Sequence, residues 1–405
     1  MMETNGLRAQ SVRRRNLALV FDTVRQAPST RSELVAATGL TRSAIGGLVG
    51  ELASLGLVRE EAGRSDGRPG RPSPVVRIDD GHVVALAVDV GVDALAVAVV
   101  GVDGAMMRSA RVPMPAAPIS PGRVCSLVVD LAEQLGCRAG RSSGRRVVGV
   151  GVAIPALVRQ PGDVVAFAPN LDWSEVSLAE MLALELESRN AATAPVVVAN
   201  EAEAAGVAEA RFGAAALRSN VLCVYGDVGV GGAVVAGGER LVGHHGFSGE
   251  VGHIAVNPSG RRCHCGGSGC WETEIGTRAL RRRARLAVGG ESDTVADILR
   301  LLEGHNARAA AAVEEHGRWV AIGLAGLINV LDPEVIVLGG LLGRLLPVYD
   351  EAMRRELGTR RFRGVERSTE IVASRLGADA TLIGAAQVAF GALVDDPFGV
   401  VRSQR

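Results

Sequence analysis

Four residues of this chain have the types and the spacing of a metal site. They follow the pattern H-x9-C-x-C-x4-C and are His253, Cys263, Cys265 and Cys270. One imidazole and three thiolates suit a closed, tetrahedral, structural Zn²⁺ site. The glycines between the last two cysteines let the backbone fold tightly around an ion, and the spacing differs from that of a zinc finger. The sequence therefore predicts bound Zn²⁺ with a structural role.

The length and composition predict a globular protein of two or three domains. A chain of 405 residues is too long for one compact core, and 47% hydrophobic with 22% charged residues is ordinary for such proteins. No apolar run reaches membrane-spanning length, and residues 1–15 lack the apolar core of a secretion signal. Outside the metal motif, Cys125, Cys137 and Cys223 lie in apolar surroundings, which is typical of buried thiols. We expect a cytoplasmic protein without a membrane partner.

Charge is distributed unevenly along the chain. The formal net charge is zero, but residues 1–77 contain 12 arginines and 7 acidic residues, and the remainder is acidic. All basic residues are arginines. A basic N-terminal segment (the head) followed by an acidic remainder (the body) indicates an anionic partner for the head alone.

The segment 1–80 has the pattern of a winged helix-turn-helix domain. Apolar residues recur at helical spacing over 16–25, and Thr30 with Glu33 forms a capping box that begins a second helix through residue 37. A turn over 38–40 leads to a third helix over 42–55 and then to a strand. In this fold the start of the third helix faces the base edges of DNA. We therefore predict DNA contacts for Thr41, Arg42 and Ser43.

The segment after that strand reads as a wing. Residues 63–72 alternate arginine with glycine and proline, and Arg64, Arg68 and Arg71 would form a thin cationic strip suited to a narrow minor groove. A solvated linker has the same composition. We favour DNA contact because the segment directly follows a helix-turn-helix pattern.

From residue 83 onward, apolar strands alternate with glycines and aspartates. We predict a hairpin over 84–91 and 95–100, a helix over 122–135, and strands over 147–152 and 196–198. A second strand and hairpin follow over 221–235. The repeated order predicts a duplicated α/β unit.

Several motifs together resemble the ROK family of repressors, open reading frames and kinases. They are the metal motif, G-V-G-V-A-I-P over 149–155, G-E-V-G-H over 249–253, C-W-E over 270–272 and the strand that ends at Gly339-Gly340. The resemblance implies a two-lobed, actin-like, sugar-kinase-like fold over residues 81–405, with the zinc motif at 253–270. The expected fold class is α/β, with the winged helix-turn-helix at the N-terminus.

The resemblance also implies a sugar site. Carried over residue by residue, its ligands are Asn200, Glu201, Glu250, His253 and Glu272. Carboxylates and amides pair well with sugar hydroxyls, which both donate and accept hydrogen bonds. His253 can bind the metal through one ring nitrogen and face the sugar with the other.

Three departures from the kinases of the family argue against phosphoryl transfer. Glu201 stands where they carry the aspartate that acts as general base, and its extra methylene misplaces the carboxylate. The first phosphate loop, residues 89–93 with Asp89 and Asp93, has an acid where the kinases carry a hydroxyl or a base, and Asp227 replaces the usual threonine of the second. We therefore expect no enzyme activity.

Taken together, the sequence predicts a sugar-responsive transcriptional regulator, in the first place a repressor. Its partners would be a double-stranded DNA operator and a monosaccharide or sugar derivative, and the protein would be a homodimer or homotetramer. Two alternatives stay open. One is a sugar kinase with an added DNA-binding head, and the other is an adaptor that binds a partner protein through its body.

Overall fold

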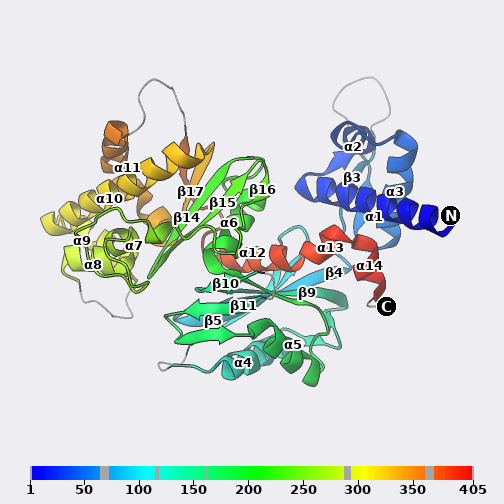
Figure 1. The fold of residues 1–405 in the computed structure, drawn as a ribbon, viewed down its shortest axis with the longest axis horizontal. Helices are drawn as coiled ribbons and strands as arrows, with labels where there is room; N and C mark the ends of the chain where they lie inside the picture. Colours follow the sequence, from blue (N-terminus) through cyan, green and yellow to red (C-terminus); the bar gives the residue numbers. More distant parts are fainter. Residues whose placement is uncertain are drawn as a thin grey trace. The chain divides into compact units, whose positions relative to one another are not determined.

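The computed structural model describes residues 2–63, 73–114, 118–160, 163–286, 293–360 and 369–403. The chain forms two compact units (Figure 1). Unit 1 consists of Met1–Ile154, Val176–Ala199 and Ala385–Arg405, and unit 2 consists of Pro155–Glu175 and Asn200–Gly384. The predicted domain boundary after residue 80 lies inside unit 1 and stays a prediction.

Unit 1 begins with three helices and a small sheet. The helices are α1 (Met2–Gln26), α2 (Arg31–Thr38) and α3 (Arg42–Ser54). The sheet has the order β1-β3-β2 and consists of β1 (Ser29–Thr30), β2 (Val58–Glu61) and β3 (Val75–Ile78). The capping box of Thr30 and Glu33 is formed, and Gly39 ends α2 with φ +70. The predicted order of helix, turn, helix and strand is therefore confirmed.

A larger sheet of unit 1 follows, with strand order β6-β5-β4-β9-β8-β7, and β13 pairs with β9. Its strands are β4 (Val83–Val90), β5 (Ala94–Gly101), β6 (Met106–Pro113), β7 (Cys137–Arg138), β8 (Arg141–Ser142), β9 (Arg145–Ile154) and β13 (Val196–Asn200). Strands β4 and β5 are antiparallel, whereas β4 and β9 are parallel. Helices α4 (Pro121–Gln134) and α5 (Leu178–Ser188) accompany this sheet, as do α13 (Gly391–Asp395) and α14 (Pro397–Ser403) near the C-terminus.

Unit 2 contains a second sheet with strand order β16-β15-β14-β17-β18. Its strands are β14 (Val221–Gly226), β15 (Val230–Ala236), β16 (Glu239–Arg240), β17 (Val335–Gly339) and β18 (Glu370–Ala373). Strands β14 and β15 are antiparallel, and β14 and β17 are parallel. This order repeats that of β4, β5 and β9, so the predicted duplication is present in the strand topology.

The remaining elements of unit 2 are a small sheet and several helices. A small sheet contains β10 (Leu157–Arg159), β11 (Val164–Ala168) and β12 (Trp173–Val176). The helices are α6 (Glu201–Phe212), α7 (Glu272–Ile275), α8 (Thr277–Ala284), α9 (Thr294–Glu303), α10 (Ala307–Leu331) and α11 (Gly340–Arg360), with short turns η1 (Val251–His253) and η2 (Gly377–Asp379). Helix α12 (Ala380–Ala389) begins in unit 2 and ends in unit 1.

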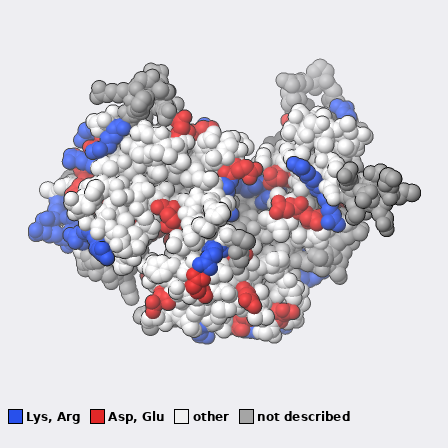
Figure 2. Space-filling model, in the orientation of Figure 1, with Lys and Arg blue, Asp and Glu red and all other residues white. Residues whose placement is uncertain are grey.

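The surface carries charge of both signs. On the face shown in Figure 2, basic and acidic side chains are interspersed, and neither sign covers a continuous area of the described residues. Among these residues, no helix is both long and apolar enough to cross a membrane.

Candidate functional site

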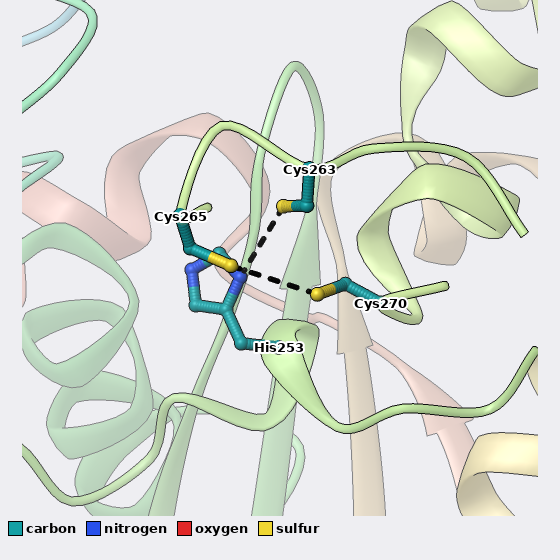
Figure 3. A group of neighbouring side chains, drawn as sticks. All are labelled: His253, Cys263, Cys265 and Cys270. Carbon is teal, nitrogen blue, oxygen red and sulfur yellow. Dashed lines mark hydrogen bonds between the residues drawn. The ribbon is translucent and has the colours of Figure 1, made fainter. Parts of the chain in front are cut away.

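The four predicted metal ligands lie together in unit 2 (Figure 3). Their ligand atoms are all within 4.8 Å of one another, with 3.7 Å between Cys263 Sγ and His253 Nδ1 and 3.6 Å between Cys265 Sγ and Cys270 Sγ. Zinc bonds of about 2.3 Å to sulfur and about 2.0 Å to nitrogen place tetrahedral ligand atoms roughly 3.5–3.8 Å apart. A disulfide would need about 2.05 Å, and all six cysteines are free. The group can hold a metal ion, and its donor set fits tetrahedral zinc.

Glycines shape the loop that carries the three cysteines. The loop closes through bridges from Ala255 to Cys270 and from Arg262 to Ser268. Gly269 has φ +71, and a Cβ there would overlap the carbonyl oxygen of Asn257. A side chain at this position is excluded by both conformation and space.

Trp271 anchors the end of this loop in the core of unit 2. Its ring is fully buried, and Nε1 donates a hydrogen bond of 2.8 Å to the carbonyl of Trp319 on α10. The ring lies against Gly323, where a Cβ would be 2.5 Å from Trp271 Cζ2. The tryptophan thus holds its neighbours, Cys270 and Glu272, at fixed places on the core.

His253 reaches the metal group from the opposite segment, η1. This turn packs directly on the backbone of β15, because a Cβ at Gly249 would overlap Gly232 and one at Gly252 would overlap Val230. Gly249 also has φ +90. The two glycines therefore allow the close approach that positions His253.

Glu250 lies beside the ring nitrogen of His253 that faces away from the cysteines. Its Oε2 is 3.6 Å from His253 Nε2, whereas Nδ1 faces Cys263. Burial raises the pKa of the Glu250 carboxyl, His253 opposes that shift, and Glu272 adds to it. A carboxylate on the outer nitrogen of a metal-binding histidine orients the ring. Glu250 is therefore placed to orient the ring of a candidate metal ligand, and it is also one of the predicted sugar ligands.

Glu272 links the metal loop to the strand β15. Its Oε2 accepts a hydrogen bond of 3.1 Å from the Val230 N–H, and the Cys263 thiol lies 3.7 Å from Oε1. The side chain therefore bridges two segments that are far apart in the sequence. It lies next to the metal group, as its place in the motif predicts.

Asn200 caps the helix α6. Its Oδ1 accepts hydrogen bonds from the N–H groups of Ala202 at 2.8 Å and Glu203 at 3.3 Å, and Nδ2 donates to the Ala156 carbonyl at 3.1 Å. This leaves the second amide hydrogen of Nδ2 for a ligand. Glu201, the first residue of α6, is half-buried.

The segment at the start of β15 lies near both Asn200, at the start of α6, and Glu272. A Cβ at Gly231 would lie 3.8 Å from Asn200 Oδ1, and a Cβ at Gly229 would lie 3.2 Å from Glu272 Oε2. The structure thus places Asn200 and Glu272 near the same short segment, Gly229 to Gly231, and Glu250 with His253 beside the metal group.

Sequence reasoning missed an ion pair between Arg240 and Glu203. Glu203 lies in the first turn of α6. Burial lowers the pKa of Arg240. The two residues are 37 positions apart, so no local pattern indicates the pair.

Three of the predicted DNA-contacting residues lie in the part of the chain that the structure describes, at the start of α3. Thr41, Arg42 and Ser43 are exposed, and Thr41 Oγ1 caps the helix by accepting from the Ala44 N–H at 3.3 Å. Arg42 has no acidic partner among the described residues. The other predicted contacts, Arg64, Arg68 and Arg71, lie outside the residues that the structure describes.

The two acids of the predicted phosphate loops have different surroundings. Burial raises the pKa of Asp89 on β4 to about 6, and Arg111, 3.9 Å away, opposes the shift. Asp227 Oδ1 accepts a hydrogen bond of 3.3 Å from the Leu341 N–H, in the first turn of α11. Its carboxylate therefore supplies negative charge at a helix N-terminus, where an anion is favoured.

Comparison with known proteins gives two kinds of match. The model of the ROK family matches residues 85–391. A glucokinase from Streptomyces coelicolor is 31% identical over 326 residues, which cover 76% of this chain and 97% of the glucokinase. A xylose repressor from Bacillus spizizenii is 25% identical over 377 residues, which cover 93% of this chain and 95% of the repressor.

A solved structure matches along nearly the whole chain. It is a ROK family transcriptional regulator, a homologue of the E. coli MLC protein, with a TM-score of 0.79 and 24% identity. The match covers 97% of this chain and 99% of the other, and it shows that the two chains share the same fold.

Proposed function

Because this chain belongs to the ROK family, we propose that it is a sugar-responsive transcriptional regulator that represses its target genes. The observation that carries the proposal is the extent of the matches. The xylose repressor match covers 93% of this chain, so it must extend well into the segment 1–80. The glucokinase match covers nearly all of the glucokinase but only 76% of this chain. This chain therefore has the length of the repressors, with a head in addition to a kinase-sized body.

In this proposal residues 1–80 bind a double-stranded operator. Thr41, Arg42 and Ser43 would meet base edges, and the wing arginines Arg64, Arg68 and Arg71 would contact phosphates and the minor groove. The outer side of α3 supports a close approach, since a Cβ at Gly47 or Gly50 would meet no atom within 4 Å. A homodimer or homotetramer in the cytoplasm would present two heads to a two-fold operator.

The body would bind a monosaccharide beside a structural zinc ion. His253, Cys263, Cys265 and Cys270 would hold the zinc, which supplies folding energy to the loop when it is bound. The sugar ligands would be Asn200, Glu201, Glu250, His253 and Glu272. The side chains of Glu250 and Glu272 lie next to metal ligands, so ordering the metal loop would also order the sugar site.

A sugar kinase is the second candidate, favoured by the 31% identity with a glucokinase. Two structural observations weigh against it. The carboxylate of Asp227 lies at the start of α11, where it opposes a second anion. The longer side chain of Glu201 stands at the position of the general base of the kinases.

The test begins with the full-length protein and a pool of random DNA duplexes. The selected duplex is then bound with and without D-xylose, D-glucose and other monosaccharides, and ATP turnover is measured with the same sugars. We expect one sugar to change DNA affinity by roughly 5- to 150-fold, with no turnover.

Two variants locate the sugar site. Glu250→Gln should abolish the sugar response and keep sugar-free DNA binding, whereas Glu239→Gln, the same change at an exposed position of β16, should respond like the parent. Failure to select any duplex above non-specific binding, or sustained phosphorylation of a sugar, would overturn the proposal.

A further inference from the structure

Helix α12 is continuous across the division between the two compact units. Unit 2 ends at Gly384 and unit 1 resumes at Ala385, and both residues lie inside this helix. The other crossings, after Ile154, Glu175 and Ala199, lie in or next to strands. Since a helix is stiffer than a loop, a displacement at one end of α12 reaches its other end.

The first half of α12 packs against the helix that carries two proposed sugar ligands. Within unit 2, a Cβ at Gly384 would overlap the carbonyl oxygen of Ala204 and lie 3.0 Å from its Cα. Ala204 is in the first turn of α6, directly after Asn200 and Glu201. Backbone therefore lies on backbone one turn from the proposed site, with no flexible side chain between them to absorb a shift.

The second half of α12 has equally close contacts within unit 1. A Cβ at Gly149 on β9 would lie 2.5 Å from the carbonyl oxygen of Ala389, and a Cβ at Gly151 would overlap that of Ala385. Close-packed interiors transmit strain because they have few voids. The helix is thus held tightly at both ends.

A buried polar pair joins this half of α12 to the head. Gln387 Oε1 accepts a hydrogen bond of 2.7 Å from Arg25 Nη2. Gln387 is 6% exposed and Arg25 is 8% exposed, so water cannot replace the bond without a rearrangement. Arg25 lies in the last turn of α1, whose Val20 and Phe21 are in the core of the head.

Helix α1 also packs against the C-terminal helices α13 and α14. Arg14 and Asp396 form an ion pair of 3.5 Å, but both side chains are substantially exposed. Exposed pairs contribute little and are screened by salt. The bond between Gln387 and Arg25 differs from that ion pair in being buried, and it joins α1 to α12 itself.

We propose that α12, through the hydrogen bond between Gln387 and Arg25, transmits the state of the sugar site to the DNA-binding head. The inference rests on the proposed function and adds the route. Sugar bound at the start of α6 shifts the first turn of that helix, and α12 moves with it because Gly384 packs on that turn. Gln387 then either pulls α1 along or loses its hydrogen bond to Arg25. Gln387 is a positioning residue that touches neither sugar nor DNA.

The test compares two glutamine-to-methionine variants. Gln387→Met keeps the length of the side chain and removes the hydrogen bond. Gln26→Met makes the same change at the exposed neighbour of Arg25, where it removes an exposed hydrogen bond to Asp22, and is the matched control for the loss of a buried one. For each protein, sugar affinity is measured by calorimetry with D-xylose and D-glucose, and affinity for the selected duplex is measured with and without that sugar.

We expect Gln387→Met to bind sugar within about 2-fold of the parent and to bind DNA without sugar as the parent does. Its sugar response, within the roughly 5- to 150-fold range of such couplings, should fall below about 2-fold. Gln26→Met should keep the full response. A full response in Gln387→Met would overturn the route.

Hydrogen exchange provides a readout that needs neither sugar nor DNA. Gln387→Met should lower the protection of amides in the last two turns of α1, and Gln26→Met should not. If the parent responds to no sugar, the proposed function fails, and exchange alone decides whether Gln387 controls α1. Unchanged protection of α1 in Gln387→Met would overturn the inference in either case.

Discussion

Replacing Gly323 by alanine should destabilise unit 2 and loosen the metal loop. The new Cβ would lie 2.5 Å from Cζ2 of the buried Trp271 and closer still to other ring atoms, whereas carbon atoms in contact are about 3.5–4.0 Å apart. The ring must therefore retreat by more than 1 Å, as an order of magnitude, in a core with few voids. The retreat also strains its hydrogen bond to Trp319.

The size of the effect follows from three contributions. Overpacking a core costs about 1–3 kcal/mol, and leaving the Trp319 carbonyl without its partner costs a further 1–3 kcal/mol or so. Alanine in place of glycine inside a helix returns about 1 kcal/mol. We therefore expect a net loss of about 3 kcal/mol, which corresponds to roughly 6–12 °C in the unfolding midpoint of a domain of this size.

The matched control is Gly326→Ala, on the same helix α10. A Cβ there would meet no atom within 4 Å, so this variant should be as stable as the parent or up to about 1 kcal/mol more stable. Calorimetry measures both midpoints, and a chelator competition measures the rate of zinc release. Because Trp271 precedes Glu272 and follows Cys270, Gly323→Ala should release zinc faster. Equal midpoints and equal release rates in the two variants would refute the reasoning about this anchor.

Four further predictions follow from the described residues. His316 is fully buried, neither ring nitrogen has a hydrogen-bond partner among the described residues, and burial lowers its pKa to about 3, with Arg283 adding to the shift. Below pH about 6.5 the unfolded chain binds a proton on this histidine and the folded state does not, so the free energy of unfolding falls as the pH is lowered. The stability advantage of His316→Phe over the parent should therefore grow by about 2 kcal/mol between pH 7 and pH 5. An equal difference in unfolding midpoint at both pH values would contradict this. Gly47→Ala should stabilise the head by about 1 kcal/mol in calorimetry yet weaken DNA binding, and unchanged affinity would remove the argument for close approach. Cys263→Ser should lower bound zinc, measured by elemental analysis, from one ion per chain, whereas metal-free parent protein purified without chelators would reject the zinc proposal. Glu209→Gln should lower the unfolding midpoint by an amount equivalent to about 2–3 kcal/mol, because this buried carboxylate accepts bonds from Ser374, Leu376 and Ala214, and a parent-like midpoint would show that the amide satisfies those donors.

Much of the fold was predictable from the sequence because its signals are local. Thr30 and Glu33 form their capping box within one turn of α2, and Gly39 ends that helix. The hairpins β4/β5 and β14/β15 connect neighbouring stretches of chain, so alternating apolar runs separated by glycine and aspartate were sufficient. The helix α1 is longer than predicted, since polar residues before 16 continue it without an apolar stripe.

The ligands of the candidate site could be predicted from the sequence, whereas the contacts that hold those ligands in place mostly could not. The metal group could be predicted from local sequence, because all four ligands fall in the short stretch from His253 to Cys270 and glycines close the loop around them. Three contacts depend on the packed fold and could not be predicted. Glu250 faces the outer nitrogen of His253, the Asn200 side chain donates to the Ala156 carbonyl while its oxygen caps α6, and Asp227 accepts a hydrogen bond at the start of α11. These contacts, like that of Gln387 with Arg25 across 362 residues, join segments that periodicity and spacing cannot relate. A local pattern shows which donors, acceptors and metal ligands a residue can provide. Its actual partner depends on which distant segment the packed core brings within hydrogen-bonding distance.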